Sequence, residues 1–120
     1  MLVVDDDPRN CELLGRLVEM EGCRVLRALN ATDGLALAVE HRPDLVLLDV
    51  RMPGIDGFAA CRRLRADPAF AALPIHLVTA FDDDEVWPPA VEAGATGLLS
   101  KPYDREALRR LIDSLRPGNP

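Results

Sequence analysis

Short apolar runs that alternate with stretches of helical periodicity constrain the fold of this chain more than any other feature of its sequence. Five of these runs are candidate β-strands: Leu2–Val4, Val25–Leu29, Leu45–Leu48, Ile75–Val78 and Leu98–Leu99. Between and after them, apolar residues recur every three or four positions, which is the spacing of one face of a helix. Strands that alternate with helices predict a parallel sheet with helices on both faces, and right-handed crossovers then fix most of the topology.

The predicted helices differ in how clear their patterns are. The last one has apolar residues at positions i, i+3, i+4 and i+7: Leu108, Leu111, Ile112 and Leu115. The stretch before Gly94 is weaker, because Pro88 and Pro89 fall where the middle of a fourth helix should be. Proline costs about 3 kcal/mol inside a helix but fits its first turn. We therefore expect this helix to begin late, near Trp87, or to be bent, with Asp82–Glu85 in a mobile acidic loop.

Length and composition point to one globular domain. The chain has 120 residues, of which 48% are hydrophobic, and we expect residues 1–116 to form the domain and residues 117–120 to be a linker or tail. The formal net charge of −6 argues against direct binding of nucleic acid or of an anionic membrane. Cys11, Cys23 and Cys61 are odd in number and widely spaced, as expected for reduced thiols in the cytoplasm.

Polar side chains closely follow four of the five apolar runs. Asp5 and Asp6 follow the first run, and Asp49 follows the third. Thr79 follows the fourth run, and Lys101, the only lysine of the chain, comes two residues after the fifth. The carboxyl ends of parallel strands meet at one edge of a sheet, where ligands bind. We therefore expect these five side chains to form one cluster.

Such a cluster is suited to phosphoryl chemistry. Neighbouring carboxylates repel one another, and a hard divalent cation such as Mg²⁺ relieves that repulsion with oxygen ligands from protein, water and phosphate. The ammonium group of Lys101 adds positive charge, and the hydroxyl of Thr79 adds a hydrogen-bond donor for a phosphoryl oxygen. A carboxylate can itself be the nucleophile and form an aspartyl phosphate, for which in-line positioning and charge neutralisation are the main requirements.

Five segments extend this pattern over the whole chain, in a fixed order and spacing: VVDDDP (Val3–Pro8), LVLLDVRMPGIDG (Leu45–Gly57), LVTA (Leu77–Ala80), EAGA (Glu92–Ala95) and KP (Lys101–Pro102). With them the sequence resembles the receiver domains of response regulators in two-component signalling, including the single-domain chemotaxis regulator. The resemblance implies a flavodoxin-like (βα)5 fold, a single doubly wound α/β domain with strand order 2-1-3-4-5. It also implies a phosphorelay, in which the domain accepts a phosphoryl group and switches conformation to control an output.

The resemblance assigns roles to the acidic residues. Asp49 matches the phosphorylated aspartate. Asp6 and Asp49 match direct ligands of Mg²⁺, and Asp5 matches a ligand that acts through water. Arg51 stands where the family supplies a backbone carbonyl to the metal, which any residue type can do. Asp7 is expected to cap the first helix.

Further roles fall on the last two strands. Thr79 and Ala80 match the positions that bind the phosphoryl group during switching, and Lys101 matches the lysine that pairs with it. Pro102 matches a proline that follows a cis peptide bond. Leu98 departs from the pattern, because the family often has an aromatic switch residue there. Rotation of an aromatic ring is therefore not available to this chain at that position.

The resemblance also implies partners. A histidine kinase or a phosphotransfer protein would donate the phosphoryl group, and a downstream effector would contact the face formed by the fourth helix, the fifth strand and the fifth helix. The protein would be cytoplasmic and bacterial and would bind neither nucleic acid nor membrane directly, while dimerisation is left open. Its phosphorylation and autodephosphorylation are self-directed, so we do not expect an enzyme.

Two other functions fit parts of the sequence. A pseudo-receiver, which is an interaction module that is never phosphorylated, would share the fold, although the complete set of site residues argues against it. A haloacid-dehalogenase-like phosphatase also uses an aspartate, Mg²⁺, a threonine and a lysine, and Asp5–Asp7 contains its D-x-D spacing. That family needs a further acidic pair beyond its lysine, whereas only one helix is expected after Lys101. It also leaves Asp49 unexplained.

Overall fold

The computed structural model describes residues 1–52, 54–80, 83–101 and 105–115. The strands of this part of the chain are β1 (Leu2–Val4), β2 (Leu26–Ala28), β3 (Val46–Asp49), β4 (Ile75–Thr79) and β5 (Gly97–Ser100). The α-helices are α1 (Pro8–Met20), α2 (Ala31–His41), α3 (Gly57–Ala66), α4 (Asp83–Ala93) and α5 (Arg105–Leu115), and a short 3₁₀ helix, η1 (Pro68–Phe70), follows α3. The predicted alternation of five strands with five helices is confirmed.

The five strands form one parallel sheet in the order β2-β1-β3-β4-β5, as predicted. β3 lies at its centre and is buried along its whole length, which accounts for its wholly apolar start. Val4, Leu48 and Leu77 lie near one edge of the sheet, where β1, β3 and β4 all end. The residues that follow these ends therefore meet at that edge.

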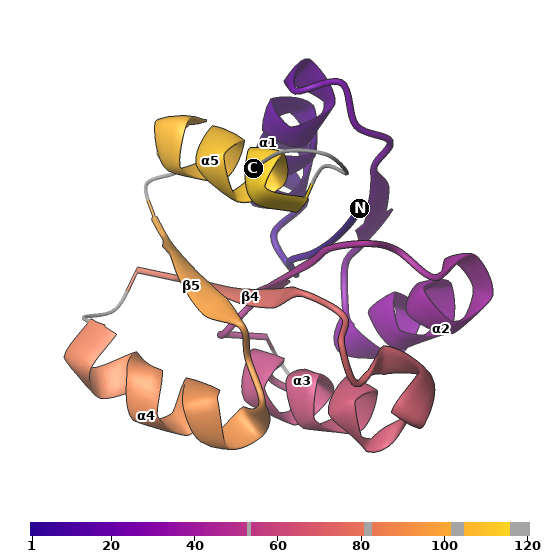
Figure 1. The fold of residues 1–120 in the computed structure, drawn as a ribbon, viewed down its shortest axis with the longest axis vertical. Coiled ribbons are helices and arrows are strands. Elements are labelled where there is room, and N and C mark those ends of the chain that lie inside the picture. Colours follow the sequence, from indigo (N-terminus) through magenta and orange to yellow (C-terminus); the bar gives the residue numbers. More distant parts are fainter. Residues whose placement is uncertain (53, 81–82, 102–104, 116–120) are drawn as a thin grey trace.

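Helices cover both faces of the sheet (Figure 1), α1 and α5 on one face and α2, α3 and α4 on the other. Each face has its own apolar core. Val3, Leu14, Leu47 and Ile112 are among the buried residues under α1 and α5. The larger core lies under the other three helices and includes buried residues of α4 as well as α3. None of the helices in the described part of the chain is long and apolar enough to span a membrane.

Polar residues that directly precede two of the helices cap their N-terminal ends. The side chain of Asp7 accepts a hydrogen bond from Arg9 N at 2.9 Å, and Pro8 is the first residue of α1, so the predicted cap is confirmed. Asp56 caps α3 in the same way, through a hydrogen bond from Ala59 N at 2.8 Å. All three cysteines are free thiols, as expected.

The start of α4 differs from the prediction. The helix begins at Asp83, so the expected start near Trp87 is wrong, and so is the expected loop for residues 83–85. Asp82, the first residue of that predicted loop, lies outside the described residues.

The physical reason is that apolar burial outweighs the two prolines. Val86, Ala90 and Ala93 are all at most 5% exposed and pack into the core that α4 shares with α3. Their spacing of four and three residues requires helical backbone from Val86 onward. Pro88 and Pro89 remove only two backbone donors, and the helix continues through both of them.

Candidate functional site

The predicted cluster forms at the edge where the strands end. Asp5, Asp49 and Thr79 are 2%, 6% and 2% exposed, and they are the buried polar residues of the described part of the chain. Asp5 directly follows β1, Asp49 is the last residue of β3, and Thr79 is the last residue of β4. The sheet therefore brings together side chains from three strands that are far apart in the sequence.

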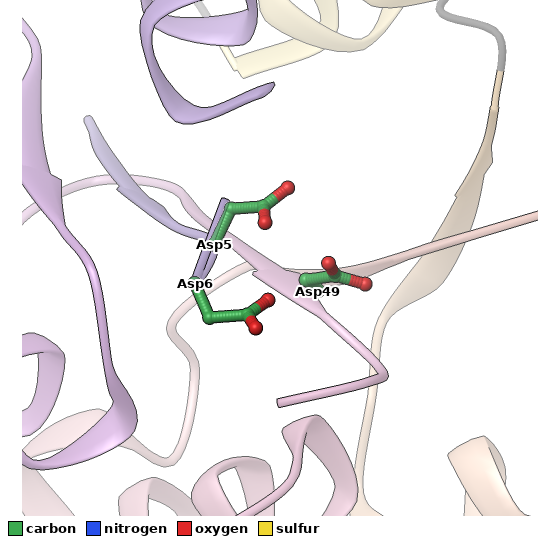
Figure 2. Close-up of side chains that lie close together, drawn as sticks. All are labelled: Asp5, Asp6 and Asp49. Atoms are coloured by element: carbon green, nitrogen blue, oxygen red, sulfur yellow. The ribbon is translucent and has the colours of Figure 1, made fainter. Parts of the chain in front are cut away.

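Three carboxylates lie close together at this edge. One oxygen from each of Asp5, Asp6 and Asp49 lies within 4.8 Å of those from the other two. Figure 2 shows Asp5 and Asp6 on the segment after β1, with Asp49 beside them at the end of β3. Asp6 is exposed, so the group opens to solvent on its side.

Backbone amides fix two of these carboxylates. Asp5 Oδ1 accepts a hydrogen bond from Asp7 N at 2.9 Å, and Asp49 Oδ1 accepts one from Arg51 N at 3.3 Å. The second oxygen of Asp5, Oδ2, is buried and has no hydrogen-bond partner among the described residues. A buried carboxylate oxygen without a donor is costly, which makes it a ready acceptor for a cation or water.

Lys101 supplies positive charge to the cluster. Its Nζ lies 3.1 Å from Asp49 Oδ2 and 3.8 Å from Asp5 Oδ2. Its backbone N–H donates to Thr79 O at 2.8 Å, which continues the pairing of β5 with β4 one residue beyond the strand. Pairing between neighbouring strands therefore places the only lysine of the chain at the acidic cluster.

Burial changes the acidity of Asp5. The pKa of that carboxyl is raised from 3.8 to about 6, mainly because the group is buried and in part because of the nearby charge of Asp49. The hydrogen bond from the Asp7 amide and the positive charge of Lys101 act in the opposite direction but do not cancel the effect. Near neutral pH the negative charge of the cluster therefore lowers the stability of the folded protein, and binding of a cation would reduce this loss.

Carboxylate oxygens that lack hydrogen-bond donors are suitable ligands for a hard divalent cation. Mg²⁺ prefers oxygen ligands and takes few of them from protein carboxylates. The buried Oδ2 of Asp5, which accepts no hydrogen bond from the described residues, and the close approach of Asp6 and Asp49 fit that preference. Lys101 alone does not balance three carboxylates.

Other predicted residues lie around the cluster. Ala80 is exposed directly after Thr79, and Leu98 is half-buried on β5 against the core beneath α2, α3 and α4. Arg51 is exposed and lies two residues beyond Asp49. Pro102 lies outside the described residues.

His76 is half-buried on β4, and burial lowers the pKa of its imidazole. Its Nδ1 has no hydrogen-bond partner among the described residues.

One contributor to the site was missed in the sequence. Gly57 begins α3, and its N–H donates to Val50 O at 3.0 Å. A Cβ atom at this position would collide with the backbone of Asp49 and Val50. Only glycine therefore lets α3 start against the end of β3. The signal in the sequence is a glycine directly after a capping aspartate, but the contact partner cannot be read from it.

Comparisons with known proteins agree with this geometry. The sequence model of the response regulator receiver domain matches residues 1–113. Protein PilH of Pseudomonas aeruginosa is 41% identical over 120 residues, which cover 98% of this chain and 98% of PilH. The DNA-binding dual master transcriptional regulator RpaA of Synechocystis sp. is 36% identical over 115 residues, and the match covers 96% of this chain but only 48% of RpaA. The crystal structure of the chemotaxis protein CheY4 of Vibrio cholerae superposes with a TM-score of 0.89 at 28% identity, covering 96% of both chains.

Proposed function

This chain belongs to the family of response regulator receiver domains, and from that premise we propose that it accepts a phosphoryl group on Asp49. The observation that carries the proposal is the surroundings of that carboxylate. Asp49 is 6% exposed, Lys101 Nζ lies 3.1 Å from its Oδ2, and two more carboxylates lie beside it. A nucleophile next to a cation and a cluster of oxygen ligands suits phosphoryl transfer.

The donor in this proposal is the phosphohistidine of a histidine kinase or of a phosphotransfer protein. An Asp49 carboxylate oxygen bonds to phosphorus in line with the phosphorus–nitrogen bond, which breaks. The electron pair of that bond returns to the imidazole nitrogen. Lys101 offsets the charge that Asp49 gains, and the amide of Arg51 holds the second carboxylate oxygen. Water later attacks the phosphorus, releases phosphate and restores the carboxylate.

The acidic cluster is proposed to hold Mg²⁺. Asp6 and Asp49 would bind the ion directly, Asp5 through water, and Arg51 through its backbone carbonyl. The ion would neutralise charge on the oxygens of the phosphoryl group. The buried oxygen of Asp5 that accepts no hydrogen bond from the described residues, and the raised pKa of this carboxyl, support the assignment.

Switching follows from the new charge at Asp49. The hydroxyl of Thr79 and the amide of Ala80 are proposed to bind the phosphoryl oxygens together with Lys101. Binding there would shift an equilibrium between two conformations and alter the face formed by α4, β5 and α5, where an effector docks. Leu98 on β5 offers no ring to rotate, so this coupling uses other groups.

The chain is thus a signalling module of two-component systems. We propose that it works in the bacterial cytoplasm, that residues 1–116 form the functional unit, and that Pro102 follows a cis peptide bond. The family match over residues 1–113 argues against the haloacid-dehalogenase-like alternative. The pseudo-receiver alternative differs from our proposal only in whether Asp49 reacts.

Beryllofluoride binding, followed by fluorine NMR, separates these two functions, because beryllofluoride imitates a phosphoryl group on a carboxylate. We expect Mg²⁺-dependent binding to the wild-type protein and none to Asp49→Asn. Asp44→Asn is the matched control, since Asp44 is an exposed aspartate before the same strand at the opposite edge of the sheet. Binding should be unchanged in that variant. A folded wild-type protein that binds no beryllofluoride with Mg²⁺ would be a pseudo-receiver.

A further inference from the structure

The α4 helix has a weak point in its middle. In an α-helix the N–H of each residue donates to the carbonyl four positions earlier. Pro88 and Pro89 have no N–H, so the carbonyls of Asp84 and Glu85 lack their helical donors. The first turn, residues 83–86, has four carbonyls, and only those of Asp83 and Val86 retain a donor four residues later. The first turn is therefore joined to the rest of α4 by about half of the usual hydrogen bonds.

Steric effects add to this weakness. Helical backbone angles are disfavoured for a residue that directly precedes a proline, because the proline ring crowds the N–H and Cβ of that residue. Trp87 and Pro88 both precede a proline, so two consecutive residues of α4 resist the conformation that they adopt. A break in the helix at this point costs little compared with a break elsewhere.

The other end of α4 is held firmly. Arg65, on α3, donates from Nε to Gly94 O at 2.8 Å and from Nη2 to Thr96 Oγ1 at 3.2 Å, just after the helix ends. Its Nη1 donates to Phe70 O at 2.7 Å. Thr96 Oγ1 in turn accepts from Ile75 N at 3.1 Å, at the start of β4. One guanidinium group thus ties the C-terminal end of α4 to α3, η1 and the sheet.

Burial follows the same division. Ala90 and Ala93, in the second half of α4, are 0% and 3% exposed. In the first turn Val86 is buried and Glu85 is exposed. Trp87, at the junction, is 42% exposed although it is a large aromatic residue. Movement of the first turn would therefore withdraw one valine from the core and would carry the exposed indole with it.

We propose that α4 is a hinged helix, in which residues 83–86 move about Trp87–Pro89 while residues 90–93 stay fixed by Arg65. The first turn begins four residues after Thr79, so a rearrangement at the end of β4 reaches it directly along the chain. The hinge converts that rearrangement into a change of the surface around Trp87. This coupling rests on the proposed function of the site, whereas the hinge itself does not.

Amide hydrogen exchange measured by NMR tests the hinge in the unmodified protein. The amide of Trp87, which closes the first turn, should exchange about tenfold faster than the amides of residues 92 and 93, whose helical acceptors lie beyond that turn. In the double variant Pro88→Ala with Pro89→Ala both missing donors return, and this difference should fall to about threefold or less. Pro88→Ala alone should give an intermediate value, and Pro43→Ala, in the loop before β3, should leave the exchange of α4 unchanged. Equal exchange along α4 of the wild-type protein, or a difference that persists in the double variant, would overturn the hinge.

Addition of beryllofluoride with Mg²⁺ to the same samples tests the coupling. Fluorine NMR reports binding independently of α4. When binding is observed, amide exchange should change at residues 83–87 of the wild-type protein and stay constant at residues 92 and 93. A bound protein with no change in α4, or with the same change throughout it, would contradict the coupling and leave the proposed function intact. Absence of binding would refute the proposed function and the coupling together, and the exchange of the unmodified protein would still decide on the hinge.

Discussion

Replacement of Asp5 by asparagine should make this protein more stable, although it removes a site residue. The side chain of Asp5 is 2% exposed, and its Oδ2 has no hydrogen-bond partner among the described residues. Asparagine has the same shape and keeps an oxygen to accept from the Asp7 amide at the position that Asp5 Oδ1 occupies. The substitution therefore removes one buried negative charge and little else.

The magnitude follows from the pKa of Asp5, which is raised from 3.8 to about 6. Each unit of difference between the folded and unfolded states corresponds to about 1.4 kcal/mol, so ionisation of Asp5 costs the folded state roughly 3 kcal/mol above about pH 6. This net cost already includes the attraction between Asp5 and Lys101. We expect Asp5→Asn to raise the free energy of unfolding by about 1–3 kcal/mol and the melting temperature by roughly 5 °C or more at neutral pH.

The pH dependence has a definite sign. Between pH 3.8 and about 6 the folded protein binds more protons at Asp5 than the unfolded chain does, so stability falls as the pH rises through that window. The advantage of Asp5→Asn should therefore be full above about pH 6 and should disappear near the lower limit of the window.

Urea unfolding followed by circular dichroism, in the presence of EDTA, measures this effect. Asp6→Asn is the matched control, because Asp6 is exposed and its charge is hydrated, so its effect should be smaller. Millimolar Mg²⁺ should stabilise the wild-type protein more than Asp5→Asn. An Asp5→Asn protein that is less stable than the wild type at neutral pH without Mg²⁺ would refute the reasoning.

Three further predictions concern residues outside the acidic cluster. Arg65→Met should lower the free energy of unfolding, measured by urea titration, by about 2–3 kcal/mol, because it leaves carbonyl acceptors unpaired. Arg63→Met, at an exposed position of the same helix, should change this free energy little, and equal effects of the two substitutions would contradict the prediction. Gly57→Ala should lower the free energy of unfolding by about 1–3 kcal/mol and weaken beryllofluoride binding, because the new methyl group pushes α3 away from the backbone at Asp49. Unchanged beryllofluoride affinity in fluorine NMR would argue against a role of Gly57 in shaping the site. Burial lowers the pKa of His76 below 6.5, so the unfolded chain takes up the proton first and the free energy of unfolding falls as the pH drops through 6.5. His76→Gln should reduce this dependence of the free energy of unfolding on pH, and an unaltered dependence would exclude His76 as its source.

The sequence predicts the sheet and the cluster because both depend on local patterns. Apolar runs of two to five residues identify the strands, and the residues that follow each run must then lie at the sheet edge. Asp5, Asp49 and Thr79 could therefore be placed together before their distances were known. Lys101 could be added because β5 pairs with β4 and ends beside Thr79.

Contacts between distant segments could not be predicted in this way. Pro88 and Pro89 dominate the local pattern of α4, and only the burial of Val86 and Ala90 shows why the helix nevertheless continues through both prolines. The hydrogen bonds of Arg65 join α3 to residues up to 31 positions away, and no periodicity marks them. In α4, tertiary packing overrode local propensity.

Phosphorylation by acetyl phosphate tests the central claim most directly. The protein is incubated with this small phosphodonor and Mg²⁺, and intact-mass and peptide-mapping mass spectrometry then count and locate the phosphoryl groups. We predict one phosphoryl group per chain, on Asp49, which is absent from Asp49→Asn and from samples without Mg²⁺ and retained in Asp44→Asn. A folded wild-type protein that gains no phosphoryl group, or gains it equally in Asp49→Asn, would contradict the assignment of Asp49 as the phosphoacceptor.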